Sequence, residues 1–451
     1  MSAKRGADVR RLLIITYHFP PDGAIGGQRW AGLSKYLVRL GWEVHVVTSS
    51  PPPPGEGPSD VHRHTCHPRR TLNALYKSAI GRLRSEARSS NVRDASKNSA
   101  QRRSFSWLRP VSALRRIVAS AMHFPDYGRG WVSRAASGAH ALLEDREFDV
   151  VVTSGPPHSA HFAGLFAMRG RPEPLWIDMR DPWSASAAGQ VPQDQLFRAE
   201  RFLLSRLEKV LFRRASKVIA NTLEFATSLS AAEPTLDVVY FPNGIDLEQL
   251  PARDPGSVQR CSIACIGALY AGRNLSSVLA AMRAVLNERP EEGAALMLSI
   301  AGPIESAHRD KLLEDIAVAG VDNLVDIHGE IPRTQALDLL NRSHLALVLA
   351  QDQPMQVPAK LYECVGLGVA TLVIAEETSA AAREARRIGA MMLADSDADG
   401  LRSVLNDMLD GRIPAKIEPK AAISYQELAV QMDRILREAL DAEHVRDAVV
   451  P

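Results

Sequence analysis

Cysteine and long apolar runs are both scarce in this sequence. Its 451 residues contain only four cysteines, Cys66, Cys261, Cys265 and Cys364. Their number and irregular spacing fit a reduced cytoplasmic compartment and do not fit a zinc site. No apolar run approaches the roughly 18 residues of a membrane-spanning helix. Any contact with a membrane is therefore expected at its surface, on the inner face.

A signal peptide is also not expected. The first apolar run, residues 12–15, follows basic residues as the core of such a peptide would. It is shorter than the roughly 7 to 15 apolar residues that this core requires, and Pro20 and Pro21 follow closely. We interpret the run as a buried first β-strand.

The charge of the chain is small overall but unevenly distributed. The net charge is +2, whereas residues 60–134 contain 16 Lys and Arg against 4 Asp and Glu. We predict a mobile basic insertion at about 60–130, which is either a solvated loop or a patch for anionic lipid headgroups or a pyrophosphate-linked acceptor. Nucleic acid is not an expected partner, because aromatic residues are not interleaved with the basic ones.

What the chain does have is an alternation of short apolar runs with segments of helical periodicity. Hydrophobic residues make up 45% and charged residues 24%, which is typical of globular α/β domains. The alternation predicts a Rossmann-like domain over 1–250, a second over 257–420, and a final helix and tail over 421–451. Parallel strands in such domains place ligands at their carboxyl ends, so a cleft between the two domains is predicted.

Three segments at expected strand ends contain candidate ligand-binding or catalytic residues. Gly26 and Gly27 precede a helix, where free backbone N–H groups favour an anion, although these glycines could equally serve only a turn. His158 follows a strand and precedes a helix, so a structural and a catalytic function are equally consistent with it. Arg180 and Asp181 lie in Asp-Met-Arg-Asp, which is either part of a site or an ion pair that fixes a loop.

The segment 357–369 has the strongest pattern in the chain. It places Pro358, Lys360 and Glu363 at the start of a short helix between two apolar runs, 345–349 and 371–375. A strand followed by a charged helix start and another strand is the local plan of a ligand-binding αβ unit.

Together these motifs resemble the GT-B glycosyltransferases of family 4 over residues 12–440. The resemblance rests on their order: Pro-Pro and Gly-Gly after the first strand, Asp-x-Arg-Asp-x-Trp, Asn-Gly-Ile-Asp, Gly then Arg-Asn-Leu, His-Gly-x-x-Pro, and Pro-x-Lys-Leu-Tyr-Glu. It implies a nucleotide-sugar donor on the C-terminal domain and a glycan or lipid-linked acceptor. The expected donor-binding residues are Gly26, Gly27, Gly267, Arg273, Glu330, Ile331, Gln356, Pro358, Lys360, Leu361 and Glu363.

The resemblance also implies which part of the donor each of these residues contacts. Glu363 matches the glutamate that accepts hydrogen bonds from the ribose hydroxyls, and Lys360 and Arg273 match cations that face the diphosphate. Glu330 and Ile331 fall where the base is held. The expected catalytic residues are His158, which resembles a histidine facing the donor sugar, and Asp181.

Two departures from the family pattern concern the sugar and the phosphates. Many members have a second glutamate where this chain has Met355, flanked by Gln353 and Gln356. Many also have arginine where this chain has Ala268 after Gly267. We therefore expect an altered donor-sugar site, and either one phosphate contact fewer or a contact supplied by Arg273 alone.

No metal and no cofactor are expected. The aspartates form no sugar-proximal Asp-x-Asp, and Lys360 and Arg273 are available to offset the charge of the diphosphate. The resemblance implies a retaining glycosyltransferase of cell-surface glycan biosynthesis. Two alternatives stay open, namely a non-hydrolysing sugar-nucleotide epimerase and a catalytically silent GT-B domain that only binds.

Overall fold

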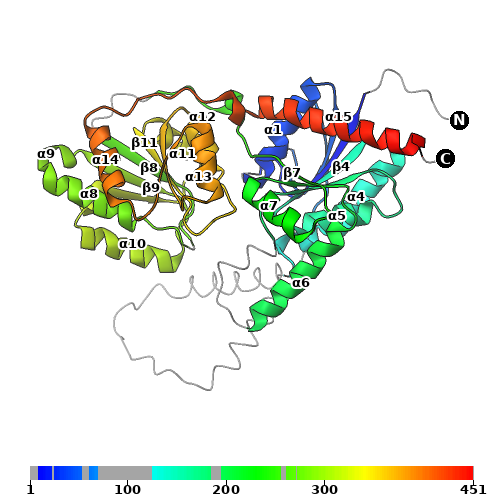
Figure 1. Ribbon diagram of the computed structural model, residues 1–451, viewed down its shortest axis with the longest axis horizontal. Helices are drawn as coiled ribbons and strands as arrows, with labels where there is room; N and C mark the ends of the chain where they lie inside the picture. The colour runs from blue at the N-terminus through cyan, green and yellow to red at the C-terminus, as the bar shows by residue number, and fades with distance from the viewer. Residues whose placement is uncertain are drawn as a thin grey trace, which may run out of the picture.

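The computed structural model describes residues 9–22, 25–52, 60–69, 124–183, 195–254, 261–270 and 272–449. They form two α/β domains that lie side by side along the long axis of the molecule (Figure 1). Most of the predicted basic insertion, including residues 85–106, lies outside the described residues.

A seven-stranded parallel sheet forms the centre of the N-terminal domain, with the strand order β3-β2-β1-β4-β5-β6-β7. The strands are β1 (Arg11–Thr16), β2 (Glu43–Thr48), β3 (Val61–Thr65), β4 (Val150–Gly155), β5 (Leu175–Met179), β6 (Lys217–Ala220) and β7 (Val238–Tyr240). The helices are α1 (Ile25–Arg39), α4 (Val132–Asp145), α5 (Ser159–Ala167), α6 (Gln195–Phe212) and α7 (Leu223–Ala232), with 3-10 turns η2 (Tyr127–Gly130) and η4 (Leu247–Gln249).

The C-terminal domain contains a six-stranded parallel sheet with the strand order β10-β9-β8-β11-β12-β13. Its strands are β8 (Cys261–Ile266), β9 (Leu296–Ala301), β10 (Val325–Gly329), β11 (Leu345–Leu349), β12 (Ala370–Ile374) and β13 (Met391–Leu393). Its helices are α8 (Ser276–Glu288), α9 (Pro290–Gly293), α10 (Ser306–Ala319), α11 (Arg333–Asn341), α12 (Lys360–Gly366), α13 (Ala380–Ile388) and α14 (Ala398–Leu409), with 3-10 turns η5 (Asp322–Leu324) and η6 (Ala421–Ile423).

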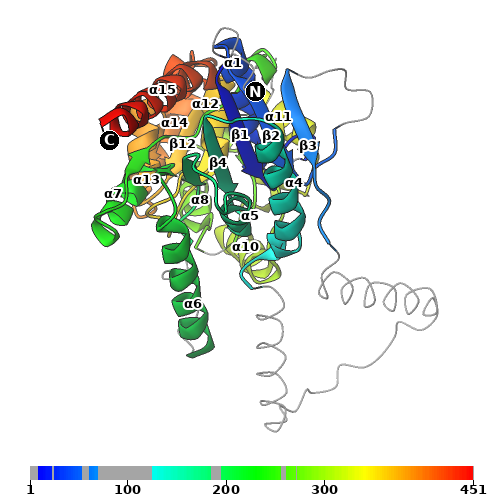
Figure 2. The same cartoon turned by 90° about the vertical axis from the view of Figure 1, so that its right-hand side faces the viewer.

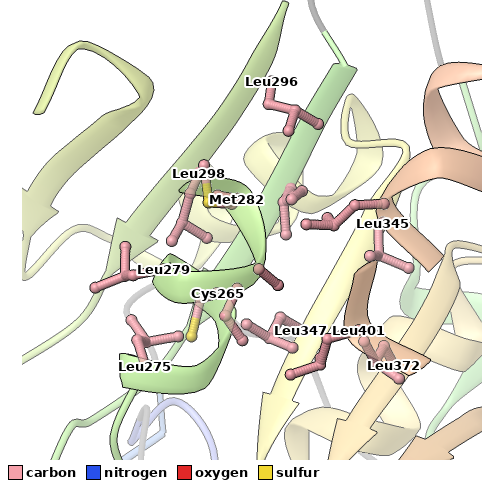
Figure 3. Packing of buried hydrophobic residues seen from close by; sticks show 14 of the residues in the cluster. Cys265, Leu275, Leu279, Met282, Leu296, Leu298, Leu345, Leu347, Leu372 and Leu401 are labelled. Carbon is pink, nitrogen blue, oxygen red and sulfur yellow. The ribbon is translucent and has the colours of Figure 1, made fainter. Parts of the chain in front are cut away.

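Leucine-rich packing holds the second sheet to its helices. Leu298 of β9 and Leu347 of β11 face Met282 of α8 and Leu401 of α14, and all four are at most 2% exposed (Figure 3). Each side chain of this size contributes roughly 1.5 to 3 kcal/mol when fully buried. Because helices cover both faces of the sheet, its strands read as continuous apolar runs in the sequence.

The last helix, α15 (Tyr425–Val449), returns to the N-terminal domain and packs along α1 (Figures 1 and 2). Leu428, Met432 and Leu436 of α15 are at most 1% exposed, in one cluster with Trp30 of α1. Where the chain crosses between domains, Ile245 donates its N–H to the Ile423 carbonyl at 2.8 Å. The predicted GT-B architecture with a returning helix is confirmed.

One local expectation differs from the structure. Gly26 and Gly27 were expected in a loop before a helix, but they lie in the first turn of α1, which begins at Ile25. A Cβ atom on Gly27 would lie 2.9 Å from the Phe19 Cα, so the close approach of the preceding loop requires glycine there.

None of the described helices is both long enough and apolar enough to cross a membrane.

Candidate active site

The carboxyl ends of the strands in both sheets border a continuous interdomain cleft. It consists of two adjoining cavities of about 470 and 490 Å³. Both cavities are lined by Arg180 and Asn243 of the N-terminal domain and by Gly267, Ala359 and Glu363 of the C-terminal domain. Volumes of this size suit a small-molecule ligand.

Lys360 lies at the floor of this cleft against the end of β8. Gly267 has a φ of +110°, and a Cβ atom there would lie 2.3 Å from the Lys360 Nζ. Glycine therefore provides both the backbone conformation and the space for the lysine side chain. Burial, with the nearby charge of Arg273, lowers the pKa of Lys360. Its ammonium group forms no hydrogen bond or ion pair with the described residues, so it is free to bind an anion.

Arg273 is the second cation of the same cavity, and it is held rigidly. Its Nη2 donates to the Oε1 of Gln353 at 2.9 Å, and its guanidinium lies 4.5 Å from the centre of the Tyr270 ring. Burial lowers the pKa of Arg273, and its Nε has no hydrogen-bond partner. Gln353, which sequence reasoning associated with the sugar, is thus a support for this arginine.

Glu363 lies between the two cavities. Its Oε1 accepts hydrogen bonds from Arg333 Nε at 3.1 Å and Nη2 at 2.7 Å. Oε2 accepts no hydrogen bond from the described residues, so one carboxylate oxygen remains available to a ligand. Glu330 and Ile331, which follow β10, line the second cavity beside Arg333. The structure therefore brings together the residues expected for the ribose and the base.

The N-terminal domain contributes Arg180 and Asp181 from the end of β5. Arg180 Nε donates to the Gly155 carbonyl at 3.0 Å, and a Cβ atom on Gly26 would lie 2.9 Å from its Nη2. Asp181 Oδ1 accepts a hydrogen bond of 2.9 Å from Gln356 Nε2, across the cleft. Burial raises the pKa of Asp181, and the charge of Arg180 opposes that shift.

Asp178, the first aspartate of the Asp-Met-Arg-Asp motif, has a structural function. It is fully buried and accepts hydrogen bonds from Trp30 Nε1 at 2.7 Å and from Ser154 Oγ at 2.8 Å. Arg29 Nε lies 3.2 Å from the same carboxylate. The aspartate thereby pairs with Arg29, not with Arg180, and fixes α1 to the sheet.

His158 lies behind the cleft rather than on its surface. Its ring stacks on Trp183 with centroids 5.0 Å apart, and it is not among the residues that line either cavity. Burial, helped by the neighbouring His161 and Arg180, holds the pKa of His158 well below 6.5, so the ring is neutral at pH 7. Its assignment to the donor sugar stays a prediction.

Several residues around the first cavity were not identified from the sequence. His18 lines it, with Nδ1 at 2.5 Å from Asp22 Oδ2 and Nε2 at 2.8 Å from the Tyr127 hydroxyl. Asn221 and Asn243 also line it. His18, Asn221 and Asn243 each lie within three residues after the end of a strand, namely β1, β6 and β7, whereas Tyr127 lies in η2.

The remaining predicted residues are divided between the cleft and its support. Pro358 lines the first cavity, whereas Leu361 is fully buried in the core of the C-terminal domain. Met355, in place of the family glutamate, packs against the N-terminal core and accepts a hydrogen bond from Thr222 through its carbonyl at 2.8 Å. This position therefore contributes to the domain contact.

Two Rossmann-like domains with a cleft of this composition define a GT-B protein. Residues 26–244, just under half of the chain, match the family model of the glycosyl transferase 4-like domain. The predicted resemblance to the GT-B glycosyltransferases of family 4 is confirmed. No curated protein sequence matches the chain.

Solved structures share the fold over almost the entire chain at low sequence identity. The sucrose-phosphate synthase of Thermosynechococcus elongatus is 13% identical, with 96% of this chain and 100% of that chain covered and a TM-score of 0.60. WaaG, a glycosyltransferase of lipopolysaccharide biosynthesis, is 14% identical, with 96% and 99% covered and a TM-score of 0.51. A protein of Listeria monocytogenes described as a UDP-N-acetylglucosamine 2-epimerase is 13% identical, with 96% and 98% covered and a TM-score of 0.51.

Proposed function

We propose that the protein transfers a sugar from a nucleotide-sugar donor to a glycan or lipid-linked acceptor. The observation that carries this proposal is the arrangement of Lys360, Arg273 and Glu363 along one continuous interdomain cleft. Buried Arg273 and partly buried Lys360, beside a carboxylate with one available oxygen, match a nucleoside diphosphate, which offers two phosphates and a pair of neighbouring ribose hydroxyls.

The leaving group determines what the cations contribute. When the bond between the sugar and the diphosphate breaks, negative charge grows on the phosphate oxygens. Lys360 and Arg273 both line the first cavity, where a positive charge stabilises the developing negative charge. Transfer without a metal ion is therefore part of the proposal.

The family resemblance favours transfer with retention of the anomeric configuration. The His18 and Asp22 pair is one group at the cavity, beside Asp181, that could accept a proton from an acceptor hydroxyl if the configuration were inverted. Proton NMR of the first product formed from an α-linked donor decides between the two, because a new α-linkage means retention and a β-linkage means inversion.

A surface on α6 supports the lipid-linked class of acceptor. Phe202, Arg206, Lys209, Val210 and Arg213 line one exposed groove of about 670 Å³ on this helix. The helix projects from the N-terminal domain in both views (Figures 1 and 2). Exposed apolar side chains beside three cations suit the interface of an anionic bilayer. We therefore propose that α6 rests on an anionic membrane surface.

Vesicle sedimentation tests the membrane proposal. The intact protein should bind vesicles of phosphatidylcholine and phosphatidylglycerol, and binding should weaken as salt screens the cations. Phe202→Asp combined with Val210→Asp should abolish most of the binding. Val318→Asp, at an 82% exposed position on α10, is the control that should change nothing. Equal binding by the double variant and the control would contradict the proposal.

A panel of radiolabelled nucleotide sugars tests the function itself. Incubation with and without a lipid-linked acceptor should yield a labelled glycan, and chelation of divalent metals should leave the rate unchanged. Recovery of an epimerised nucleotide sugar would instead support the epimerase alternative. The Listeria protein that shares this fold is described as such an epimerase. Binding without turnover would select a silent GT-B domain.

A further inference from the structure

A cluster of histidines lies at the edge of the N-terminal sheet, away from the cleft. Strand β3 is the edge strand and pairs in parallel with β2, so that His45 is the register partner of His62 (Figure 2). Glu43, His45, His62 and His64 occupy alternating positions and hence share one face of the sheet. Glu43 opens β2, which places the cluster toward the amino ends of the strands, whereas the cleft lies at their carboxyl ends.

The spacing of the polar atoms is suited to a cation. One ligand atom each of Glu43, His45 and His62 lies within 4.8 Å of the other two. His45 Nε2 is 2.9 Å from Glu43 Oε1. A metal ion with bonds of about 2.0 to 2.2 Å to nitrogen and oxygen can bridge two atoms at that distance with little movement. The His62 ring, exposed and stacked 4.6 Å from His45, supplies the third ligand.

His64 contacts the ring nitrogen of His45 that does not face Glu43. Its Nε2 lies 3.0 Å from His45 Nδ1, and the two rings are nearly parallel with centroids 5.2 Å apart. A histidine that binds a metal through one nitrogen is normally held by a hydrogen bond at its other nitrogen. Here His64 occupies the position of that supporting partner.

Two arginines decide which cations can bind. Arg11 Nε lies 2.8 Å from Glu43 Oε2, and Arg146 Nη1 lies 3.7 Å from Glu43 Oε1. Because these guanidinium groups already balance the carboxylate charge, attraction to a cation must come from the imidazole lone pairs. Imidazole favours zinc and its first-row neighbours over magnesium and calcium, which prefer oxygen ligands.

We propose that Glu43, His45 and His62 form a zinc site, with His64 as the residue that positions His45. A fourth ligand is a water molecule, as at zinc sites with three protein ligands. The ion would tie the edge strand β3 to β2, and this site is separate from the proposed transfer reaction.

Titration calorimetry on the chain without an affinity tag, after chelation and gel filtration, tests this proposal. Zinc chloride should bind with one site per chain and should raise the melting temperature, whereas magnesium chloride should do neither. His62→Ala changes an exposed residue and should weaken zinc binding by more than tenfold. His64→Ala should weaken it by about 10 to 100-fold, the usual effect of removing a supporting partner.

The matched control is His328→Ala, which removes a partly exposed histidine with a neighbouring aspartate, Asp326, from the other domain. This control should bind zinc as the parent chain does. Absence of zinc binding to the parent chain, or equal binding by His62→Ala and the parent, would overturn the proposal. Because the readouts are binding and melting, failure of this site leaves the proposed transferase function untouched.

Discussion

Glu363 offers the sharpest test at the scale of single residues. Arg333 donates two hydrogen bonds to one of its carboxylate oxygens, and the residue lines the cleft. Glu363→Gln replaces a charged acceptor with a neutral amide, and hydrogen bonds to charged groups contribute about 1.5 to 3 kcal/mol. We expect nucleoside diphosphate binding to weaken about 10 to 100-fold in calorimetry.

The control for this change is Glu377→Gln, which alters a 77% exposed glutamate paired with Arg386. It should leave nucleotide affinity unchanged. Equal affinities for Glu363→Gln and the parent chain would remove Glu363 from the ribose site.

Lys360 predicts a pH dependence. Burial lowers its pKa from the ordinary value of 10.5, so its positive charge is lost at a lower pH than that of an exposed lysine. The kcat/KM of the proposed transfer should therefore fall as the pH rises toward 10. Lys360→Arg keeps the charge and should flatten this fall. An identical alkaline fall in both proteins would assign it to another group.

The sequence predicted the residues on one side of the cleft better than those on the other. Lys360 and Glu363 are near neighbours on one short segment, so their spacing alone was informative. Tyr127 reaches the cavity only because a distant 3-10 turn packs beside the loop after β1, and no local pattern reports that contact. His158 has the expected position at a strand end, but Trp183 covers its ring, which only side-chain packing reveals.

At the scale of elements, α5 is held on the sheet by a buried histidine. His161 is fully buried, and its Nδ1 lies 2.9 Å from Thr153 Oγ1 of β4. Burial, with the charge of Arg180 and against that of Asp178, lowers its pKa to about 4. The unfolded chain, with an ordinary value near 6.5, therefore binds this proton more readily than the folded chain.

The contribution of neutral His161 to the free energy of unfolding should thus be fully present above pH 6.5. It should decline as the pH falls toward 4. Between pH 7 and pH 5 the loss attributable to His161 is about 2 kcal/mol in the free energy of unfolding. Urea titrations at both pH values should show a smaller loss for His161→Gln. His140→Gln, a partly exposed position on α4, is the control and should behave as the parent chain does.

The helices and strands themselves were largely predictable, because buried parallel strands produce apolar runs that are easy to recognise. The start of α1 was misplaced, since glycines are poor helix formers and the pair at 26 and 27 resembled a loop. The tight packing of Gly27 against Phe19 overrides that preference.

At the scale of the whole molecule, the two chain crossings lie together. Ile245 and Tyr425 exchange backbone hydrogen bonds with the opposite crossing segment, at 2.8 and 2.9 Å. Two linked crossings restrict the domains to rotation about a shared axis. Binding of a nucleotide sugar should close the cleft, and small-angle X-ray scattering should show a smaller radius of gyration. An unchanged radius on saturation with the donor would contradict closure.

The return of α15 also has a consequence for how the protein is made. The ribosome synthesises the first sheet and α1 early, but Leu428, Met432 and Leu436 of α15, which cover α1, emerge only after the second domain. Until then an apolar face around Trp30 stays without its partner. The first domain of the chain is therefore the last to be completed, and it depends on chaperones or on its own partial stability for the duration of translation.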